Sequence, residues 1–129
     1  MGTLHANNAY DALNRLETMA LMSEVELPLT ALRSQVSSAI DVVIHLVRQV
    51  GGFRQVTQIA EVMPVGTDGH YALKDIFNLQ QGLDEDGNKT MQLKATGERS
   101  AMAGHLKPGM AEMVTERTQA IFATDDEAK

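Results

Sequence analysis

The chain opens on the stretch that decides its fold, TLHANNAYDALNRLE, which runs from Thr3 to Glu17. A short apolar run brings His5 to a small, amide-rich turn, and a helical pattern begins directly afterwards. Asn8 can cap that helix, with Asp11 three residues on as a short form of the capping box. Strands of open α/β sheets end in this way where they present a side chain at the ligand-binding edge. The stretch therefore predicts a parallel strand that ends at His5.

Two helices are predicted after this turn. The second begins with Pro28 near its first turn, a favoured place for proline. It carries an apolar stripe from Leu29 to Val50, opposite polar side chains, and is ended by Gly51 and Gly52. In the first helix the apolar residues that recur at helical spacing are Tyr10, Leu13, Leu16, Ala20 and Leu21.

Three strands are predicted next, over residues 53–63, 71–79 and 91–95, because β-branched runs and apolar–polar alternation mark each of them. Turns at 66–69 and 82–88 separate them, and turns this short join antiparallel neighbours. A last helix is predicted around residues 110–121, followed by an acidic, frayed end. The fold class is therefore α/β, with two N-terminal helices, an antiparallel three-stranded meander and a C-terminal helix.

Composition narrows the classes of function. The chain has 129 residues, 43% hydrophobic and 22% charged, with a net charge of −6. That acidic balance argues against a broad nucleic-acid or anionic-lipid surface. The sequence has no cysteine, which excludes disulfides and thiolate metal sites. No apolar run reaches about 18 residues, so no membrane span is predicted, and a cytoplasmic protein is the simple interpretation.

Several short motifs together resemble the type II/type IV secretion and pilus-assembly ATPases, and in particular the CpaF-like motors of Tad/Flp pili. His5 occupies the place of their His box, and the similar motifs cover roughly residues 3–97 in the order of the family. Beyond His5, these motifs are Leu13–Met19, Leu27–Leu29, Leu32–Val36, Ser38–Val43, Arg54–Thr57, Ile59–Val62, Leu73–Phe77 and Lys94–Gly97.

The sequence also departs from that family. It contains no Gly-x-x-x-x-Gly-Lys-Ser/Thr loop, whose backbone N–H groups and lysine hold the nucleotide phosphates. Residues 98–129 drift from the family pattern, with Lys107, Pro108 and Gly109 where an unbroken helix is expected. The resemblance therefore implies the C-terminal part of a RecA-like P-loop motor domain over residues 1–97. Residues 98–129 would be a helical extension with a disordered end.

This resemblance carries expectations about cofactors and partners. The complete protein would hydrolyse ATP with Mg²⁺ in a ring, expected to be a hexamer, at inner-membrane secretion or pilus platform proteins. It would be cytoplasmic and peripheral to that membrane, without direct contact to nucleic acid. The fragment alone would bind neither ATP nor Mg²⁺ and would be inactive. Two alternatives stay open: a conjugation-type motor, and a non-catalytic truncated paralogue that acts as an interaction module.

Two residues are candidates for the site. The resemblance implies that His5 senses the γ-phosphate, whereas a lone histidine near a terminus is otherwise without a role. Arg15 could contact the nucleotide or a subunit boundary, where a guanidinium stabilises phosphate charge. The spacing alone favours an i,i+4 pair between Arg15 and Asp11 instead. Arg33 and Arg48 are interpreted as solvated surface charges.

Metal sites are not predicted. The four histidines have no paired ligand spacing. The segment Asp84–Asn88 hints at a calcium loop, but the next residue is Lys89 where glycine is needed, and Ala95 stands where the last carboxylate would be. An ordinary hairpin turn is the prediction there.

Overall fold

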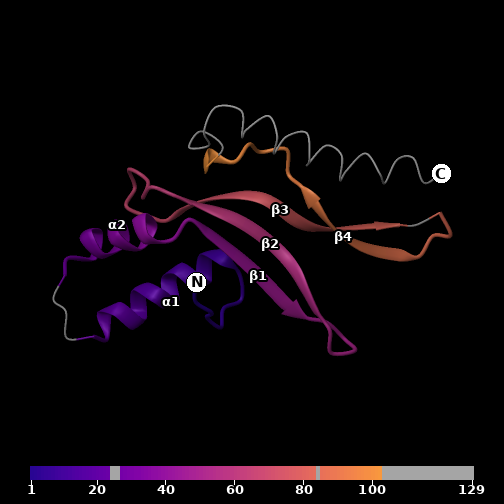
Figure 1. The fold of residues 1–129 in the computed structure, drawn as a ribbon, viewed down its shortest axis with the longest axis horizontal. Helices are drawn as coiled ribbons and strands as arrows, with labels where there is room; N and C mark the ends of the chain where they lie inside the picture. The colour runs from indigo at the N-terminus through magenta and orange to yellow at the C-terminus, as the bar shows by residue number, and fades with distance from the viewer. Residues whose placement is uncertain (24–26, 84, 103–129) are drawn as a thin grey trace. The chain divides into compact units, whose positions relative to one another are not determined.

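The computed structural model describes residues 1–23, 27–83 and 85–102, and the chain divides into two compact units, Met1–Glu98 and Arg99–Lys129. The first unit holds two helices and a four-stranded antiparallel sheet (Figure 1). These elements are α1 (Ala9–Leu21), α2 (Leu29–Ala39), β1 (Val42–Arg48), β2 (Arg54–Met63), β3 (Ala72–Leu83) and β4 (Lys89–Ala95). The described part of the second unit ends in a short 3₁₀ turn at residues 101–102.

Helix α1 begins where the sequence predicts. The backbone of Asn8 is extended, and its side-chain oxygen accepts a hydrogen bond from the Asp11 amide at 2.8 Å. This bond satisfies one of the N–H groups that a helix leaves unpaired in its first turn. Ala9 and Leu13 are fully buried, and they lie on one side of the helix because they are four residues apart.

Helix α2 is much shorter than predicted. It starts after Pro28, whose carbonyl accepts the first helical bond from Leu32, and it ends at Ala39. The prediction of one helix to Val50 is wrong because residues 42–48 form strand β1. The run after Asp41 is β-branched, and such side chains lose rotamer freedom in a helix but pack well on a sheet.

The sheet is a meander with the order β1-β2-β3-β4, so it has four strands where three were predicted. Each strand pairs antiparallel with its sequence neighbour. The predicted turn before β3 is present: the Gly69 amide donates to the Gly66 carbonyl at 2.9 Å, and Gly69 has a φ of +77° that favours glycine. The antiparallel meander and the α/β class are thereby confirmed.

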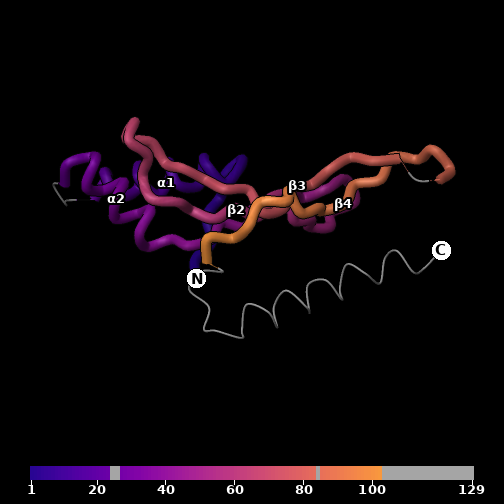
Figure 2. The backbone as a smooth tube through the Cα atoms, turned by 90° about the horizontal axis from the view of Figure 1, so that it is seen from above, coloured from indigo at the N-terminus to yellow at the C-terminus, as the bar shows by residue number. Residues whose placement is uncertain are grey.

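The helices flank only one part of the sheet. Helix α1 contacts α2, β1 and β2. The far end of the β3–β4 hairpin extends away from both helices, as two perpendicular views show (Figures 1 and 2). The described residues that are buried and apolar are accordingly few: Ala9, Leu13, Leu32, Ala60 and Tyr71.

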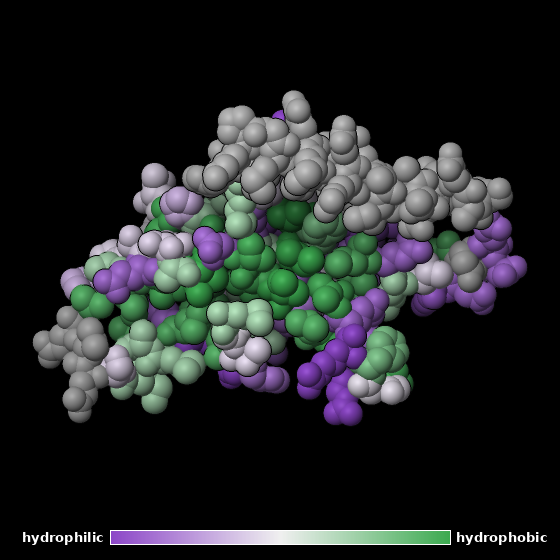
Figure 3. Space-filling model, in the orientation of Figure 1, coloured by the Kyte–Doolittle hydropathy of each residue, from purple (hydrophilic) through white to green (hydrophobic). Residues whose placement is uncertain are grey.

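Strand β1 exposes much of its apolar surface. Val42, Ile44 and Leu46 are 37%, 54% and 51% exposed. They alternate along the strand with the half-buried Val43 and His45 and so lie on the other face of the sheet. Apolar side chains gather over the middle of the sheet in the space-filling view (Figure 3).

Two further predictions concern the ends of the chain. Residues 1–6 are not assigned to a strand, so the predicted parallel strand ending at His5 is absent. A strand needs a partner for its backbone groups, and all four strands of the described sheet are antiparallel and follow in chain order. The predicted C-terminal helix lies outside the described residues.

Across the described ranges, no helix is long and apolar enough to cross a membrane.

Candidate functional site

Polar side chains from three elements hold the main chain around His5. The Arg15 Nη1 of α1 donates to the His5 carbonyl at 2.6 Å. His45 Nε2 of β1 lies 3.2 Å from the Ala6 carbonyl. The Ala9 amide donates to Gln58 Oε1 of β2 at 3.1 Å. We call residues 5–9 the His5 segment; its backbone is fixed although it belongs to no strand.

The two predicted site residues, His5 and Arg15, are therefore brought together. The contact joins the guanidinium to the backbone of His5, and both side chains are exposed. The Asp11 carboxylate, which spacing alone pairs with Arg15, instead accepts bonds from the Asn7 amide at 2.9 Å and from its side chain at 3.0 Å. Arg15 thus holds the backbone of the segment, and the His5 side chain remains exposed.

His45 is a participant that the sequence interpretation missed. Its Nδ1 lies 2.7 Å from the Thr57 hydroxyl oxygen, and its Nε2 reaches Ala6. The register of β1 and β2 shifts between His45 and Leu46, so Thr57 has no direct partner in the ladder. Such a bulge re-aims neighbouring side chains. The available signal was alternation, since His45 and Val43 share the half-buried face of β1.

Behind Gln58 a polar network continues across the sheet. Gln58 Nε2 donates to Asp75 Oδ1 at 2.7 Å, and Asn78 Nδ2 donates to Asp75 Oδ2 at 2.9 Å. The side-chain oxygen Oε1 of Gln58 is thereby turned toward the Ala9 amide, because the side-chain nitrogen Nε2 already donates to the Asp75 carboxylate. Asp75 on β3 thus sets the orientation of the Gln58 side chain on β2, which accepts the hydrogen bond from the first residue of α1.

A second cluster ties α1 to α2 and to the turn before β3. Arg33 Nε and Nη2 donate to the two Glu17 carboxylate oxygens at 2.8 and 3.2 Å, and Arg33 Nη1 donates to the Gly69 carbonyl at 2.9 Å. The side chains of Glu17 and Arg33 are only 12% and 21% exposed. The interpretation of Arg33 as a solvated charge is therefore wrong, whereas Arg48 is exposed as expected.

The charges of this cluster shift the acidities of its members. Hydrogen bonds from Arg33 lower the pKa of Glu17 from its ordinary value, against an opposing effect of burial. The pairing with Glu17 raises the pKa of Arg33. Burial, and then the Glu17 carboxylate, raise the pKa of Tyr71 to about 12. The Tyr10 and Tyr71 rings form a T-shaped pair with centroids 6.4 Å apart. The cluster therefore joins α1, α2 and the turn before β3.

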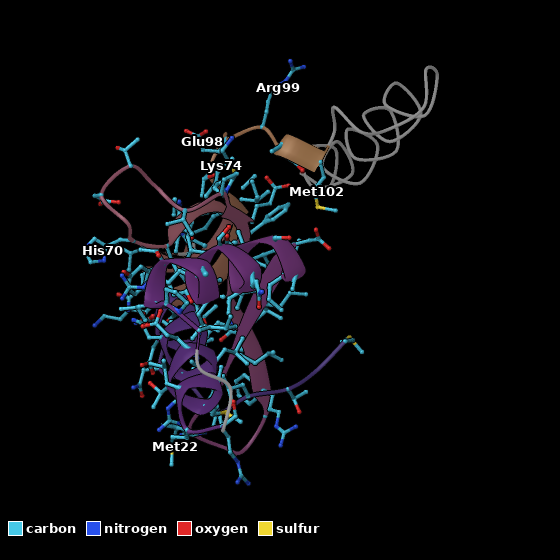
Figure 4. All side chains as sticks on the ribbon, turned by 90° about the vertical axis from the view of Figure 1, so that its left-hand side faces the viewer. Met22, His70, Lys74, Glu98, Arg99 and Met102 are labelled. Carbon is cyan, nitrogen blue, oxygen red and sulfur yellow. The ribbon has the colours of Figure 1, made fainter. Side chains whose placement is uncertain are left out.

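Metal-binding groups do not converge in the part of the chain that the structure describes: no set of three or more His, Asp or Glu side chains could hold an ion there. His70 is exposed on the turn before β3 (Figure 4). His105 and Asp84, which the sequence analysis considered as ligands, lie outside the described residues.

Comparison with known proteins identifies the family of the chain. A family model described as "Type II/IV secretion system protein" matches residues 1–121. Two similar proteins, both from Mycobacterium tuberculosis, are named putative conjugal transfer proteins, one from strain CDC 1551 and one from H37Rv. Each is 27% identical over 85 residues, which is 66% of this chain and 23% of the relative. The chain thus spans less than a quarter of their length in the match, but the family match covers nearly all of it. The chain belongs to the type II/IV secretion system protein family.

Proposed function

We propose that this chain is the C-terminal part of an ATP-hydrolysing motor that powers pilus assembly or secretion, of the CpaF-like type that serves Tad/Flp pili. The observation that carries the proposal is the His5 segment: an exposed imidazole on a backbone held by Arg15, His45 and Gln58, in a chain of the secretion family. A fixed backbone with an accessible side chain suits a group that must meet a ligand at a defined position.

His5 would act as a hydrogen-bond donor to the terminal phosphate of a bound nucleotide. An imidazole suits this role because it donates in both its neutral and its charged form. Arg15 would support it in two ways, by holding the His5 carbonyl and by adding positive charge beside the phosphate. No covalent step is required of either residue, because phosphoryl transfer depends on positioning and electrostatics.

The residues in hand do not by themselves fit ATP and Mg²⁺. The sequence has no phosphate-cradling P-loop, and within the described ranges no carboxylate cluster could hold the ion. The proposal therefore assigns the phosphate cradle and the Mg²⁺ ligands to another part of the complete motor. The isolated chain is expected to bind no ATP and to hydrolyse none.

Membership of the secretion family supports a proposed setting for the motor. The complete motor would work as a ring, expected to be a hexamer, on the cytoplasmic side of the inner membrane, against platform proteins of the secretion or pilus apparatus. A conjugation-type motor is the second candidate, and the names of the two mycobacterial relatives favour it. It would share the chemistry at His5 and differ in its cargo.

A decisive test begins with the reading frame upstream of codon 1. A continuous frame that encodes a Gly-x-x-x-x-Gly-Lys-Ser/Thr loop supports the motor, and stop codons in its place favour a non-catalytic interaction module.

The protein encoded by the continuous frame is then assayed for phosphate release. His5→Ala should lower turnover strongly, while His70→Ala, at an exposed histidine outside the His5 segment, should leave turnover unchanged. Equal turnover for wild type and His5→Ala would refute the assigned role.

A further inference from the structure

The side chains of His45 and Gln58 are cross-strand partners, and both reach the His5 segment. The register pairs the two residues directly across β1 and β2. His45 contacts the Ala6 carbonyl, and Gln58 accepts from the Ala9 amide. One strand pair therefore holds the segment at two points: His45 contacts it at Ala6, and Gln58 accepts a hydrogen bond from it at Ala9.

The partners of His45 specify its hydrogen-bonding state. A carbonyl oxygen can only accept, so Nε2 must carry a proton to bond Ala6. In the neutral ring, Nδ1 then accepts a hydrogen bond from the Thr57 hydroxyl, whose oxygen lies 2.7 Å away. If the ring is charged, Nδ1 donates to Thr57 instead, and the Thr57 hydroxyl can turn to the His45 carbonyl at 3.3 Å. The bond to Ala6 is present in both states.

We infer that His45 is a positioning residue for His5. It links the bulged β1–β2 pair to the carbonyl one residue beyond His5. The Ala6 carbonyl requires a proton on Nε2, and the Thr57 hydroxyl adapts to Nδ1 as donor or acceptor. Gln58 provides the second point, at the first residue of α1. Because both residues belong to one register pair, any displacement of β1 and β2 carries the His5 segment with it. The consequence for catalysis rests on the proposed function; the positioning itself does not, and it is measurable without nucleotide.

Nuclear magnetic resonance on the full chain tests the inference. The ¹⁵N shifts of the wild-type His45 ring should report a protonated Nε2 with Nδ1 as an acceptor. His45→Gln places an amide N–H near the position of Nε2 and should keep the signals of the His5 ring and of the Ala6 and Asn7 amides. His45→Asn reaches only as far as Nδ1 and should move these signals.

Hydrogen exchange gives a second readout of the same role. In His45→Asn the Ala9 amide should exchange about three- to tenfold faster than in His45→Gln, because one of the two anchors is lost. Thr57→Val, which keeps the shape and removes the hydroxyl, should change the Nδ1 signal. His70→Gln is the matched control and should leave all His5-segment signals in place.

The opposite results would overturn the inference. A protonated Nδ1 with an unprotonated Nε2 in the wild type excludes the bond to Ala6, and this measurement needs no variant to fold. Equal spectra of the His5 segment in His45→Gln and His45→Asn would show that His45 does not position it. If the complete protein showed no ATP turnover, the proposed motor function would fail, but these spectra and exchange rates would not change. The two proposals can therefore be refuted separately.

Discussion

Arg33 and Glu17 form a two-point ion pair between α2 and α1, with Nε–Oε2 and Nη2–Oε1 distances of 2.8 and 3.2 Å. A guanidinium matches a carboxylate in this parallel geometry, whereas a lysine ammonium offers a single point. The third Arg33 contact, to the Gly69 carbonyl, adds the turn before β3 to the same fastening. One side chain thus joins three segments that are distant in sequence.

The Glu17–Arg33 pair should make stability depend on pH in the acid range. The pKa of Glu17 is lowered in the folded chain by its hydrogen bonds to Arg33, relative to an ordinary value of 4.5. A lowered pKa contributes stability that is fully present above the unfolded value and is lost as pH falls through the folded one. Urea unfolding below about pH 4.5 should therefore show a steeper loss in the wild type than in Glu17→Gln. If the unfolding free energy fell equally steeply with decreasing pH in the two proteins, the Glu17–Arg33 pairing would be contradicted.

Substitution of Arg33 should separate charge from geometry. Arg33→Lys keeps the positive charge but cannot make both carboxylate contacts and the Gly69 contact together, so we expect a lower melting temperature than in the wild type. Arg33→Met removes the charge as well and should lower it further. Arg48→Met, at an exposed position on β1, is the control and should leave the melting temperature nearly unchanged.

Tyr71 should give a signal in the alkaline range. Its hydroxyl is buried beside Glu17 without a partner in hydrogen-bond geometry among the described residues, and its pKa is raised from 10.0 to about 12. A raised pKa contributes stability that is present below the unfolded value and is lost as pH rises through the folded one. Ultraviolet titration should show one tyrosine that ionises near pH 12, and this transition should disappear in Tyr71→Phe.

Tyr71→Phe also tests the state of that hydroxyl. Removing a buried polar atom that lacks a partner is neutral or stabilising, whereas removing a made hydrogen bond costs about 1 kcal/mol. We expect an unchanged or slightly higher free energy of unfolding at pH 7. A clear loss of stability would instead assign a hydrogen bond between Tyr71 and the Glu17 carboxylate.

Gln58 should be sensitive to both of its partners. Gln58→Leu leaves the buried Ala9 amide without an acceptor and should cost about 1–3 kcal/mol of unfolding free energy. Gln58→Glu still offers that acceptor but places a second carboxylate against Asp75, which Gln58 contacts at 2.7 Å. The loss in Gln58→Glu should therefore be larger at pH 7 than at pH 4, because a proton between the carboxyls replaces the lost donor. A pH-independent loss would exclude this account.

The apolar residues should divide sharply by location. Leu13 is fully buried on α1, so Leu13→Ala should cost about 2–5 kcal/mol. Ile44 is 54% exposed on β1, and Ile44→Thr keeps its β-branched shape, so the cost should be about 0.5 kcal/mol or less. Urea unfolding of both variants checks the contrast, and a large loss in Ile44→Thr would mean that the exposed face of β1 is covered in solution.

The features that follow from neighbouring residues were predictable. The Asn8 cap depends on a residue three positions on, and the turn that ends at Gly69 depends on its own glycines. Strand β1 was not, because Val43, Leu46 and Val50 fit a helical stripe while Val42, Ile44 and Leu46 fit an alternating strand. The shared residue Leu46 satisfies both periods, and only pairing with β2 decides between them.

The contacts around the candidate site were predictable only in part, because they too depend on residues that are distant in sequence. His5 and Arg15 stand out in the sequence, and the structure joins them, but through a backbone carbonyl that no pattern of side chains reveals. His45 and Ala6 are 39 residues apart, and Arg33 and Glu17 are 16 apart. Such contacts depend on where the strands and helices lie relative to one another, which local sequence does not specify.

The chain order of the meander has a kinetic consequence. Each strand pairs with its immediate sequence neighbour, so the hairpins close short loops at little entropic cost and should assemble early. The bond between Ala9 and Gln58 spans 49 residues and can form only once β2 is in place. The His5 segment should thus be the last part of this unit to dock during folding, and the first to detach when the native state opens locally.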